Sequence, residues 1–122
     1  MQYTSSFNTI EAILKKIFVF TLLAVASSVA SAGASSGTIS SYLVSRYGKL
    51  FFVAGPTDNS PSCSGAGHWA VDLVGPDAAA GKAILAAVIA AQMSGKRVFV
   101  QGKCVCDVWG DRETVDYISV ET

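Results

Sequence analysis

Residues 75–96, GPDAAAGKAILAAVIAAQMSGK, constrain the fold most, because they have the pattern of one helix with both ends marked. Pro76 and Asp77 are typical of a helix N-terminus, with Asp77 as the capping side chain, and Ser94-Gly95 is typical of a left-handed stop. The large apolar residues recur at one-, three- and four-residue spacings, which predicts that one face packs on the core. They are Ile84, Leu85, Val88, Ile89 and Met93.

The rest of this helix carries small apolar residues and Lys82 as its only charge between Asp77 and Lys96. A helix that is apolar nearly all round is often buried on more than one side. We therefore expect a second chain on this face, although alanine is also the best helix former and tolerates water. The residues assigned to an oligomer contact are Ala79, Ala83, Ala86, Ala87 and Ala90.

The N-terminus predicts export. Lys15 and Lys16 precede the apolar run at residues 17–26, and small residues follow with Ala30-Ser31-Ala32 as a cleavage motif. This order is typical of a secretory signal peptide over residues 1–32, and the apolar run is short for a membrane anchor, which needs about 20 residues. We expect a secreted or periplasmic protein with one domain at residues 33–122, and no membrane span.

Charge argues against nucleic acid as a partner. The chain has nine basic and nine acidic residues and forms no basic run. Sequence-independent binding to nucleic acid needs such a positive surface.

Three cysteines lie in the exported part, where disulfides are permitted. Cys104 and Cys106 are two residues apart and on a strand would share a face, so Cys63 is expected to bond one of them. We favour Cys63 with Cys106, and the pairing with Cys104 stays open. A zinc site with His68 is the weaker alternative, since no C-x-x-C pair is present.

Alternating and apolar runs predict five strands, at residues 39–44, 50–54, 68–74, 96–105 and 114–120. Residues 33–40 are interpreted as a mainly flexible lead-in and residues 55–67 as a long loop. The order is β-β-β-α-β-β. This mainly β pattern with one helix predicts a small five-stranded barrel of the OB type, with the helix plugging one end. An open α+β sheet is the alternative.

No catalytic constellation is recognisable, so we expect neither an enzyme nor a cofactor or metal. His68 is the only histidine and directly precedes Trp69 on a strand, which favours a structural role. Asp111 and Glu113 could form a carboxylate pair of the glycosidase kind, but they flank Arg112 in a predicted turn. We interpret both as solvated turn charges.

Flat aromatic side chains with a polar edge favour a binding function. Trp69 and Tyr117 alternate with polar residues on strands, and we expect both in the core. Trp109 is a further candidate for stacking. Tyr42 and Tyr47 lie among serines and Arg46, so the predicted glycan-binding residues are Ser40, Tyr42, Arg46 and Tyr47. OB barrels bind oligosaccharides and oligonucleotides, and the neutral charge favours sugars.

The order of elements also resembles a known family. Two strands, a cysteine-bearing loop, a strand, an Ala-rich helix ending in SGKRV, and Cys106-x-x-Trp109 after the next strand are similar to the B subunits of AB-type bacterial toxins, of the subtilase-cytotoxin and pertussis-like group, and to small related secreted bacterial proteins. The likeness spans residues 38–120, and residues 91–100 match best.

The resemblance implies an OB fold, a homo-oligomeric ring of five subunits with the helices around the pore, and recognition of host-surface glycans. It places a sialic-acid-contacting serine at Ser40, whereas Gln92 or Met93 stands where the family has an assisting tyrosine. A separate catalytic A subunit would be the partner. A small exported protein-interaction module, such as an inhibitor or envelope protein, is the alternative function.

Overall fold

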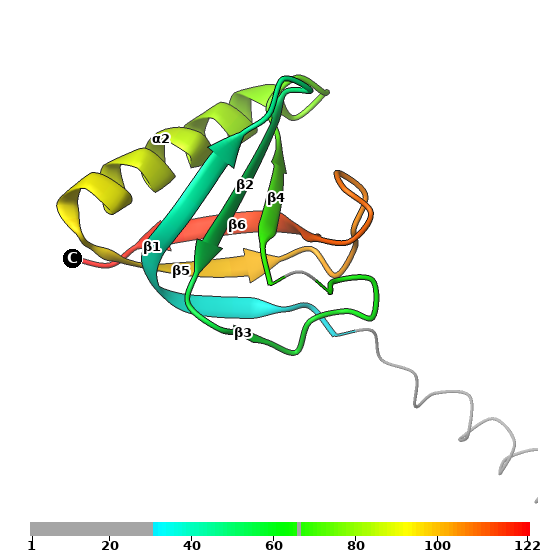
Figure 1. Cartoon of the computed structure of the whole chain (residues 1–122), viewed down its shortest axis with the longest axis horizontal. Helices are drawn as coiled ribbons and strands as arrows, with labels where there is room; N and C mark the ends of the chain where they lie inside the picture. The colour runs from blue at the N-terminus through cyan, green and yellow to red at the C-terminus, as the bar shows by residue number, and fades with distance from the viewer. Residues whose placement is uncertain (1–30, 66) are drawn as a thin grey trace, which may run out of the picture.

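A computed structural model describes residues 31–65 and 67–122 of the chain (Figure 1). The predicted signal peptide lies outside the described residues, except for Ser31 and Ala32. Within the described part, six strands and one helix follow in the order β1-β2-β3-β4-α2-β5-β6. Their bounds are β1 Ala34–Val44, β2 Lys49–Ala54, β3 Thr57–Asp58, β4 Trp69–Asp72, α2 Ala78–Ser94, β5 Arg97–Gly102 and β6 Glu113–Val120.

Five of these strands close into a ring. β1 pairs antiparallel with both β2 and β5, β2 pairs with β4, and β5 pairs with β6. The ring closes where β4 and β6 run parallel, with Trp69 opposite Glu113. The two-residue β3 adds to the edge of β1. This connectivity, with the helix between β4 and β5, confirms the predicted OB-like barrel.

β1 is longer than expected, and the prediction of a flexible lead-in at residues 33–40 is wrong. Ser35, Gly37 and Ile39 are buried, whereas the residues between them are exposed. Two of the three buried residues are small and not strongly apolar, so the sequence shows little hydrophobic alternation in this part of the strand. Trp69 confirms its expected core position, because it is 1% exposed and donates its indole N–H to the Ser35 hydroxyl at 2.8 Å.

The barrel interior is filled by apolar side chains from every long strand. Leu50 and Phe52 of β2 and Val98 and Val100 of β5 are completely buried. They are two residues apart on their strands and therefore face the same side. Val88 of α2 completes this core from the side of the helix.

Helix α2 is confirmed, with changes at both ends. Gly95 has the left-handed stop (φ 68°), but Asp77 makes no side-chain cap hydrogen bond, so that prediction is wrong. Ile84 and Leu85 pack against the core as expected, while Met93 is 81% exposed and does not. The helix approaches β4 most closely at Gly81, where a side chain would meet the carbonyl oxygen of Asp72.

The fourth predicted strand ends early. β5 stops at Gly102, and Cys104 follows with φ 69°, outside the extended conformation. Cys63 and Cys106 form the favoured disulfide, with a Cα–Cα distance of 6.2 Å, and Cys104 is a free, half-buried thiol. The disulfide joins residues 55–67 to residues 103–112. The two segments are also joined by a backbone hydrogen bond from the Gly65 N–H to the Asp111 carbonyl at 3.0 Å.

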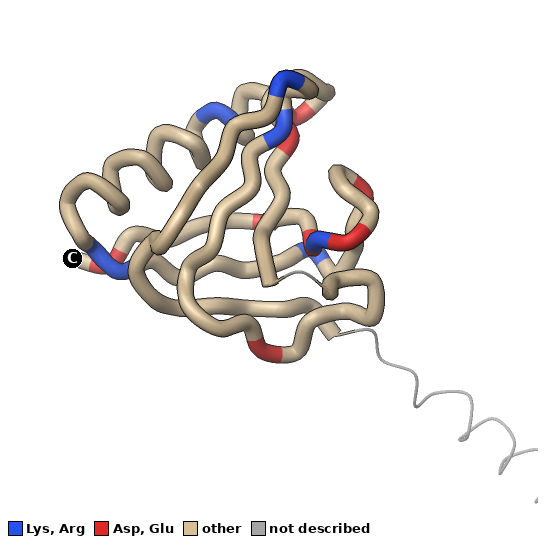
Figure 2. Tube along the Cα trace, viewed as in Figure 1, with Lys and Arg blue, Asp and Glu red and all other residues tan. Residues whose placement is uncertain are grey.

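Basic and acidic residues are interspersed along the described part of the chain, as Figure 2 shows. None of the helices in the described residues is long and apolar enough to cross a membrane.

Candidate functional site

Two predicted binding residues meet in the turn between β1 and β2. The Arg46 guanidinium donates to the Tyr47 hydroxyl at 2.8 Å and lies 4.9 Å from the centroid of its ring. Tyr47 is 57% exposed, so the ring is presented to solvent. The short β hairpin holds both side chains on the surface.

The loop before β6 brings further aromatic and cationic groups to this turn. Trp109 lies 6.3 Å from Tyr47 between ring centroids and contacts Phe51 edge-on at 5.2 Å. The guanidinium of Arg112 lies 4.3 Å above the Phe51 ring. We call these five residues, Arg46, Tyr47, Phe51, Trp109 and Arg112, the aromatic face.

A groove of about 260 Å³ adjoins the aromatic face and shares Phe51 and Arg112 with it. Tyr42, a predicted binding residue, lines this groove and is 40% exposed. The other lining residues are Ser41, Leu43 and His68. Hydroxyl, guanidinium and imidazole groups therefore surround an apolar floor, which is a suitable surface for a polar molecule with one flat apolar side.

Ser40 lies beside this groove in sequence but does not line it. It is exposed and falls at an irregularity in the β1–β2 pairing, between Ile39 and Ser41. Its neighbour Ser41 contributes to the groove instead. The assignment of Ser40, Tyr42, Arg46 and Tyr47 to glycan binding stays a prediction, and the structure brings three of the four to one region.

Sequence reasoning missed several members of the site. Phe51 lies in a continuous apolar run, where nothing distinguishes an outward from an inward residue, and it is buried only because Trp109 and Arg112 cover it. Tyr117, expected in the core, is 50% exposed and packs on Phe99 at 6.2 Å instead. The sequence shows that two sets of residues alternate along β6, but it does not show which set faces the core.

A larger cleft of about 570 Å³ lies between the start of α2 and strands β2, β4 and β6. Two of the charged side chains that line it, Lys49 and Asp72, are paired with each other. The hydroxyl of Thr114 donates to Asp107 and lowers the pKa of that carboxyl, against the opposing effect of burial. Among the described residues, no three histidine, cysteine, aspartate or glutamate side chains are grouped to hold a metal ion.

Asp72 and Lys49 form an ion pair at the mouth of this cleft. The residues are opposite each other in the β2–β4 register, and the ammonium lies 2.9 Å from the carboxylate. The Lys49 hydrogen bond lowers the pKa of Asp72, and the backbone N–H of Val74 adds to this effect. Both side chains retain about a fifth of their exposure.

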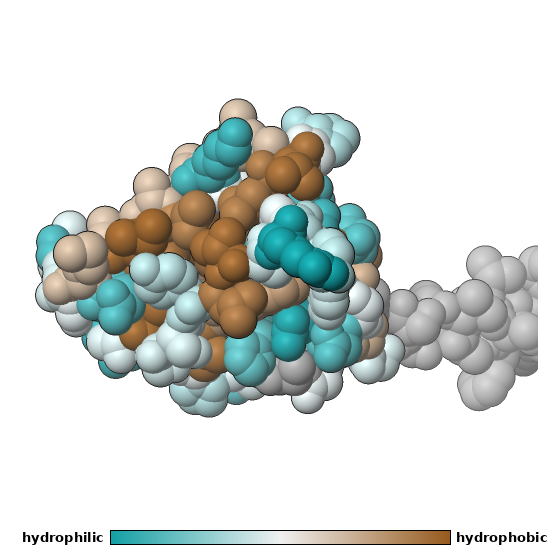
Figure 3. All heavy atoms as spheres, turned by 45° about the horizontal axis from the view of Figure 1, so that its top comes forward, coloured by the Kyte–Doolittle hydropathy of each residue, from teal (hydrophilic) through white to brown (hydrophobic). Residues whose placement is uncertain are grey.

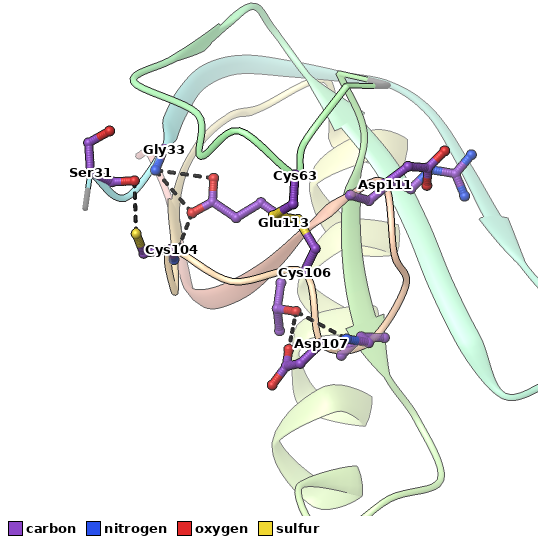
Figure 4. The surroundings of a disulfide bond; sticks show 11 residues. Ser31, Gly33, Cys63, Cys104, Cys106, Asp107, Asp111 and Glu113 are labelled. Atoms are coloured by element: carbon purple, nitrogen blue, oxygen red, sulfur yellow. Dashed lines mark hydrogen bonds and ion pairs between the residues drawn. A yellow bond between two sulfur atoms is a disulfide. The ribbon is translucent and has the colours of Figure 1, made fainter.

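Glu113 is not the solvated turn charge that the sequence predicted. It begins β6 and is 1% exposed. Its carboxylate accepts hydrogen bonds from the backbone N–H groups of Gly33 and Cys104 (Figure 4). Gly33 and Gly102 leave the space that it occupies, because a side chain at either position would meet its oxygens. The Cys63–Cys106 disulfide lies beside this carboxylate in the same view.

Comparison with protein-family models, with curated proteins and with solved structures gave no match. The function is therefore argued from the aromatic face and its groove, and from the sequence.

Proposed function

We propose that this protein is an exported, non-catalytic binding protein that recognises cell-surface glycans through the aromatic face and the adjoining groove. The observation that supports this proposal is the exposed Tyr47–Trp109 ring pair, with Arg46 against Tyr47 and Arg112 against the adjoining Phe51. A disulfide-bonded fold is compatible with the secreted or periplasmic location that the N-terminal sequence predicts.

The chemistry of this surface suits a sugar. The apolar side of a pyranose packs on a flat ring, while its hydroxyl groups require nearby donors and acceptors. Tyr47 and Trp109 supply exposed rings, and Arg46 and Arg112 supply planar sets of donors that also suit a carboxylate. Both rings are open to solvent, with Tyr47 57% and Trp109 38% exposed.

A glycan array with the exported protein tests this proposal. Tyr47→Ala should weaken binding about threefold to tenfold, which corresponds to the roughly 0.5–1.5 kcal/mol of an aromatic contact. Tyr117→Ala is the matched control, because Tyr117 is exposed to a similar extent on another part of the barrel. If Tyr47→Ala and Tyr117→Ala bind glycans equally well, the aromatic face does not contribute to glycan binding.

Ser40→Ala distinguishes two modes of glycan recognition. If the protein uses the serine that the toxin-subunit resemblance indicates, this variant abolishes binding while the fold is retained. If the groove itself carries recognition, Ser41→Ala has the larger effect. An array without any glycan signal, combined with a tight protein partner, would instead support the protein-interaction module.

We also propose that the protein is a homo-oligomer, a ring of five in the toxin-like arrangement, and that a separate A subunit could be its partner. Ala79, Ala83, Ala86 and Ala90 are exposed on α2, and Ala87 is half-buried. Apolar side chains also run in a band across the face shown in Figure 3, and Leu43, Val44 and Val74 are among the exposed apolar residues of the molecule.

Light scattering of the exported protein measures this assembly. A mass five times that of the chain is expected, and Ala86→Glu should reduce it to a monomer by placing charges in the contact. Gln92→Glu is the control, because Gln92 is exposed on the same helix but lies about 120° round it from Ala86, and it should leave the mass unchanged. If the unmodified protein has the mass of a monomer, the proposed ring is wrong and the exposed alanines of α2 contact only solvent.

A further inference from the structure

The buried carboxylate of Glu113 has an unusual set of partners. It is 1% exposed, and within the described residues it accepts backbone N–H groups, from Gly33 at 3.1 and 3.0 Å and from Cys104 at 2.9 Å. No lysine or arginine of residues 31–65 and 67–122 forms an ion pair with it. A buried charge without a counter-charge is costly, so a cation at this position would be strongly favoured.

The nitrogen of Gly33 is placed where such a cation would lie. Its single amide proton is shared between both oxygens of Glu113. The residue is also held from its other side, because its carbonyl accepts from the Gly102 N–H at 2.9 Å and from the Gln101 amide at 3.3 Å. Gly33 is therefore fixed on the sheet independently of whatever precedes it.

The sequence places a cleavage motif directly before this nitrogen. Ala30 and Ala32 are the small residues that a signal peptidase requires at the third and first positions before the cut. A cut after Ala32 would make Gly33 the first residue. Two independent observations, the motif and the buried carboxylate, thus point to the same peptide bond.

We propose that the Ala32–Gly33 bond is the processing site, and that the new α-ammonium of Gly33 forms a buried ion pair with Glu113. This inference rests on the proposed export and not on glycan recognition. A signal peptidase hydrolyses the bond: water supplies a hydroxyl to the carbonyl carbon of Ala32 and a proton to the nitrogen of Gly33, and the amine takes up a second proton from solvent. The nitrogen of Gly33 carries one proton in the peptide bond and three protons as an ammonium after the cut.

The ammonium improves the site in two ways. It supplies a separate proton to each oxygen of Glu113, and it provides the missing positive charge. The change also removes Ser31, whose carbonyl accepts a weak hydrogen bond from the Cys104 thiol at 3.0 Å and whose hydroxyl donates to the Asn59 carbonyl at 3.1 Å. These exposed contacts contribute little compared with a buried ion pair.

The first test is the N-terminal sequence of the protein exported from the full chain by a bacterial host. Gly33 is expected as the first residue. Any other first residue, or an uncut chain, overturns the proposal. This result is independent of the glycan array, so failure of one leaves the other interpretable.

The second test compares the thermal midpoint of the processed protein with that of a variant whose cleavage motif is shifted upstream, so that Ser31 becomes the first residue. The form beginning at Gly33 should melt at least about 10 °C higher, as expected when a buried ion pair is made in a small domain. Glu113→Gln should reduce this difference to less than about 2 °C. Glu121→Gln, at an exposed ion pair with Arg97, should leave it unchanged.

A third measurement remains informative if Glu113→Gln does not fold. The α-amine of the processed protein is treated with an acetylating reagent and compared with the amine of exposed Lys82 in the same molecule. We expect the α-amine to react at least tenfold more slowly in the folded protein than after unfolding. A rate unchanged by unfolding, together with equal thermal midpoints for the two N-termini, would show that Gly33 and Glu113 do not form an ion pair.

Discussion

Asp72 and Glu113 lie on the neighbouring strands β4 and β6, and their charges are satisfied in different ways. Asp72 is partly exposed and has a side-chain cation, Lys49, directly opposite it in the sheet. Glu113 is enclosed, and the partners within its reach are backbone groups. The partner of Asp72 lies directly opposite it on the neighbouring strand. The partners of Glu113 come from residues 33 and 104, which are brought to the start of β6 only when the barrel folds.

This difference shows that the position of a carboxylate in the barrel decides how far it is buried and which groups pair with it. Asp72 is the last residue of β4, beside an open cleft, where Lys49 can reach it with water still present. Glu113 lies where β4 and β6 join, and its carboxylate is hydrogen-bonded to Gly33 and Cys104 (Figure 4). Its environment can therefore be changed by the disulfide and by the N-terminus, while that of Asp72 cannot.

Among the changes proposed here, removal of the disulfide should alter the surroundings of Glu113 most, relative to those of Asp72. Cys63→Ser with Cys106→Ser should lower the free energy of unfolding by about 2–5 kcal/mol, because the bond closes a long loop. Hydrogen exchange should accelerate at the amide of Cys104, which donates to Glu113, and at the amide of Gly102, which donates to the Gly33 carbonyl. Exchange of the β2–β4 amides beside Asp72 should change much less.

Cys104→Ser is the control for the disulfide variants, because Cys104 is a free thiol in the same loop. We expect it to change the free energy of unfolding by less than about 1 kcal/mol. Equal acceleration of exchange around Asp72 and Glu113 in the double variant would contradict the proposed independence of the two sites.

Loss of the Lys49 cation should have a smaller effect. Lys49→Met should lower the free energy of unfolding at pH 7 by about 0.2–1 kcal/mol, the usual range for a partly exposed ion pair. Because the pKa of Asp72 is lowered from 3.8 in the folded protein, its contribution is present above that value. It is lost as the pH falls through the lower folded-state pKa.

Urea unfolding at pH 7 and at pH 3 checks this prediction. The unmodified protein should lose more stability between the two pH values than Lys49→Met does. Lys82→Met, at an exposed lysine of α2, should behave like the unmodified protein. An acid profile of Lys49→Met identical to that of the unmodified protein would show that Lys49 does not act on Asp72.

The fold could be predicted from the sequence because its main elements have strong local patterns. The helix has a marked C-terminus at Gly95, and the β2 run and Trp69 of β4 could be recognised from apolar residues alone. The first half of β1 could not, because its inward positions include Ser35 and Gly37. These residues are typical of loops, and only pairing with β5 makes them part of a sheet.

The proposed binding surface could be predicted in part. Tyr42, Arg46 and Tyr47 were accessible to sequence reasoning because aromatic and polar residues are adjacent there. Phe51 and Arg112 were not, since their contact joins segments far apart in the chain. Glu113 was missed for a related reason: a carboxylate next to a turn has the same local pattern whether it is solvated or enclosed.

The parallel pairing of β4 with β6 has a consequence for the order in which the protein folds. This short seam, with Trp69 opposite Glu113 and Ala70 opposite Thr114, is where the ring closes. It joins residues far apart in the chain, and such non-local contacts form late and slowly. During synthesis the β1–β2–β4 meander can assemble first, but β4 keeps an unpaired edge until the start of β6 has followed. Until that last strand arrives, this edge is where the chain is most open to pairing with another chain.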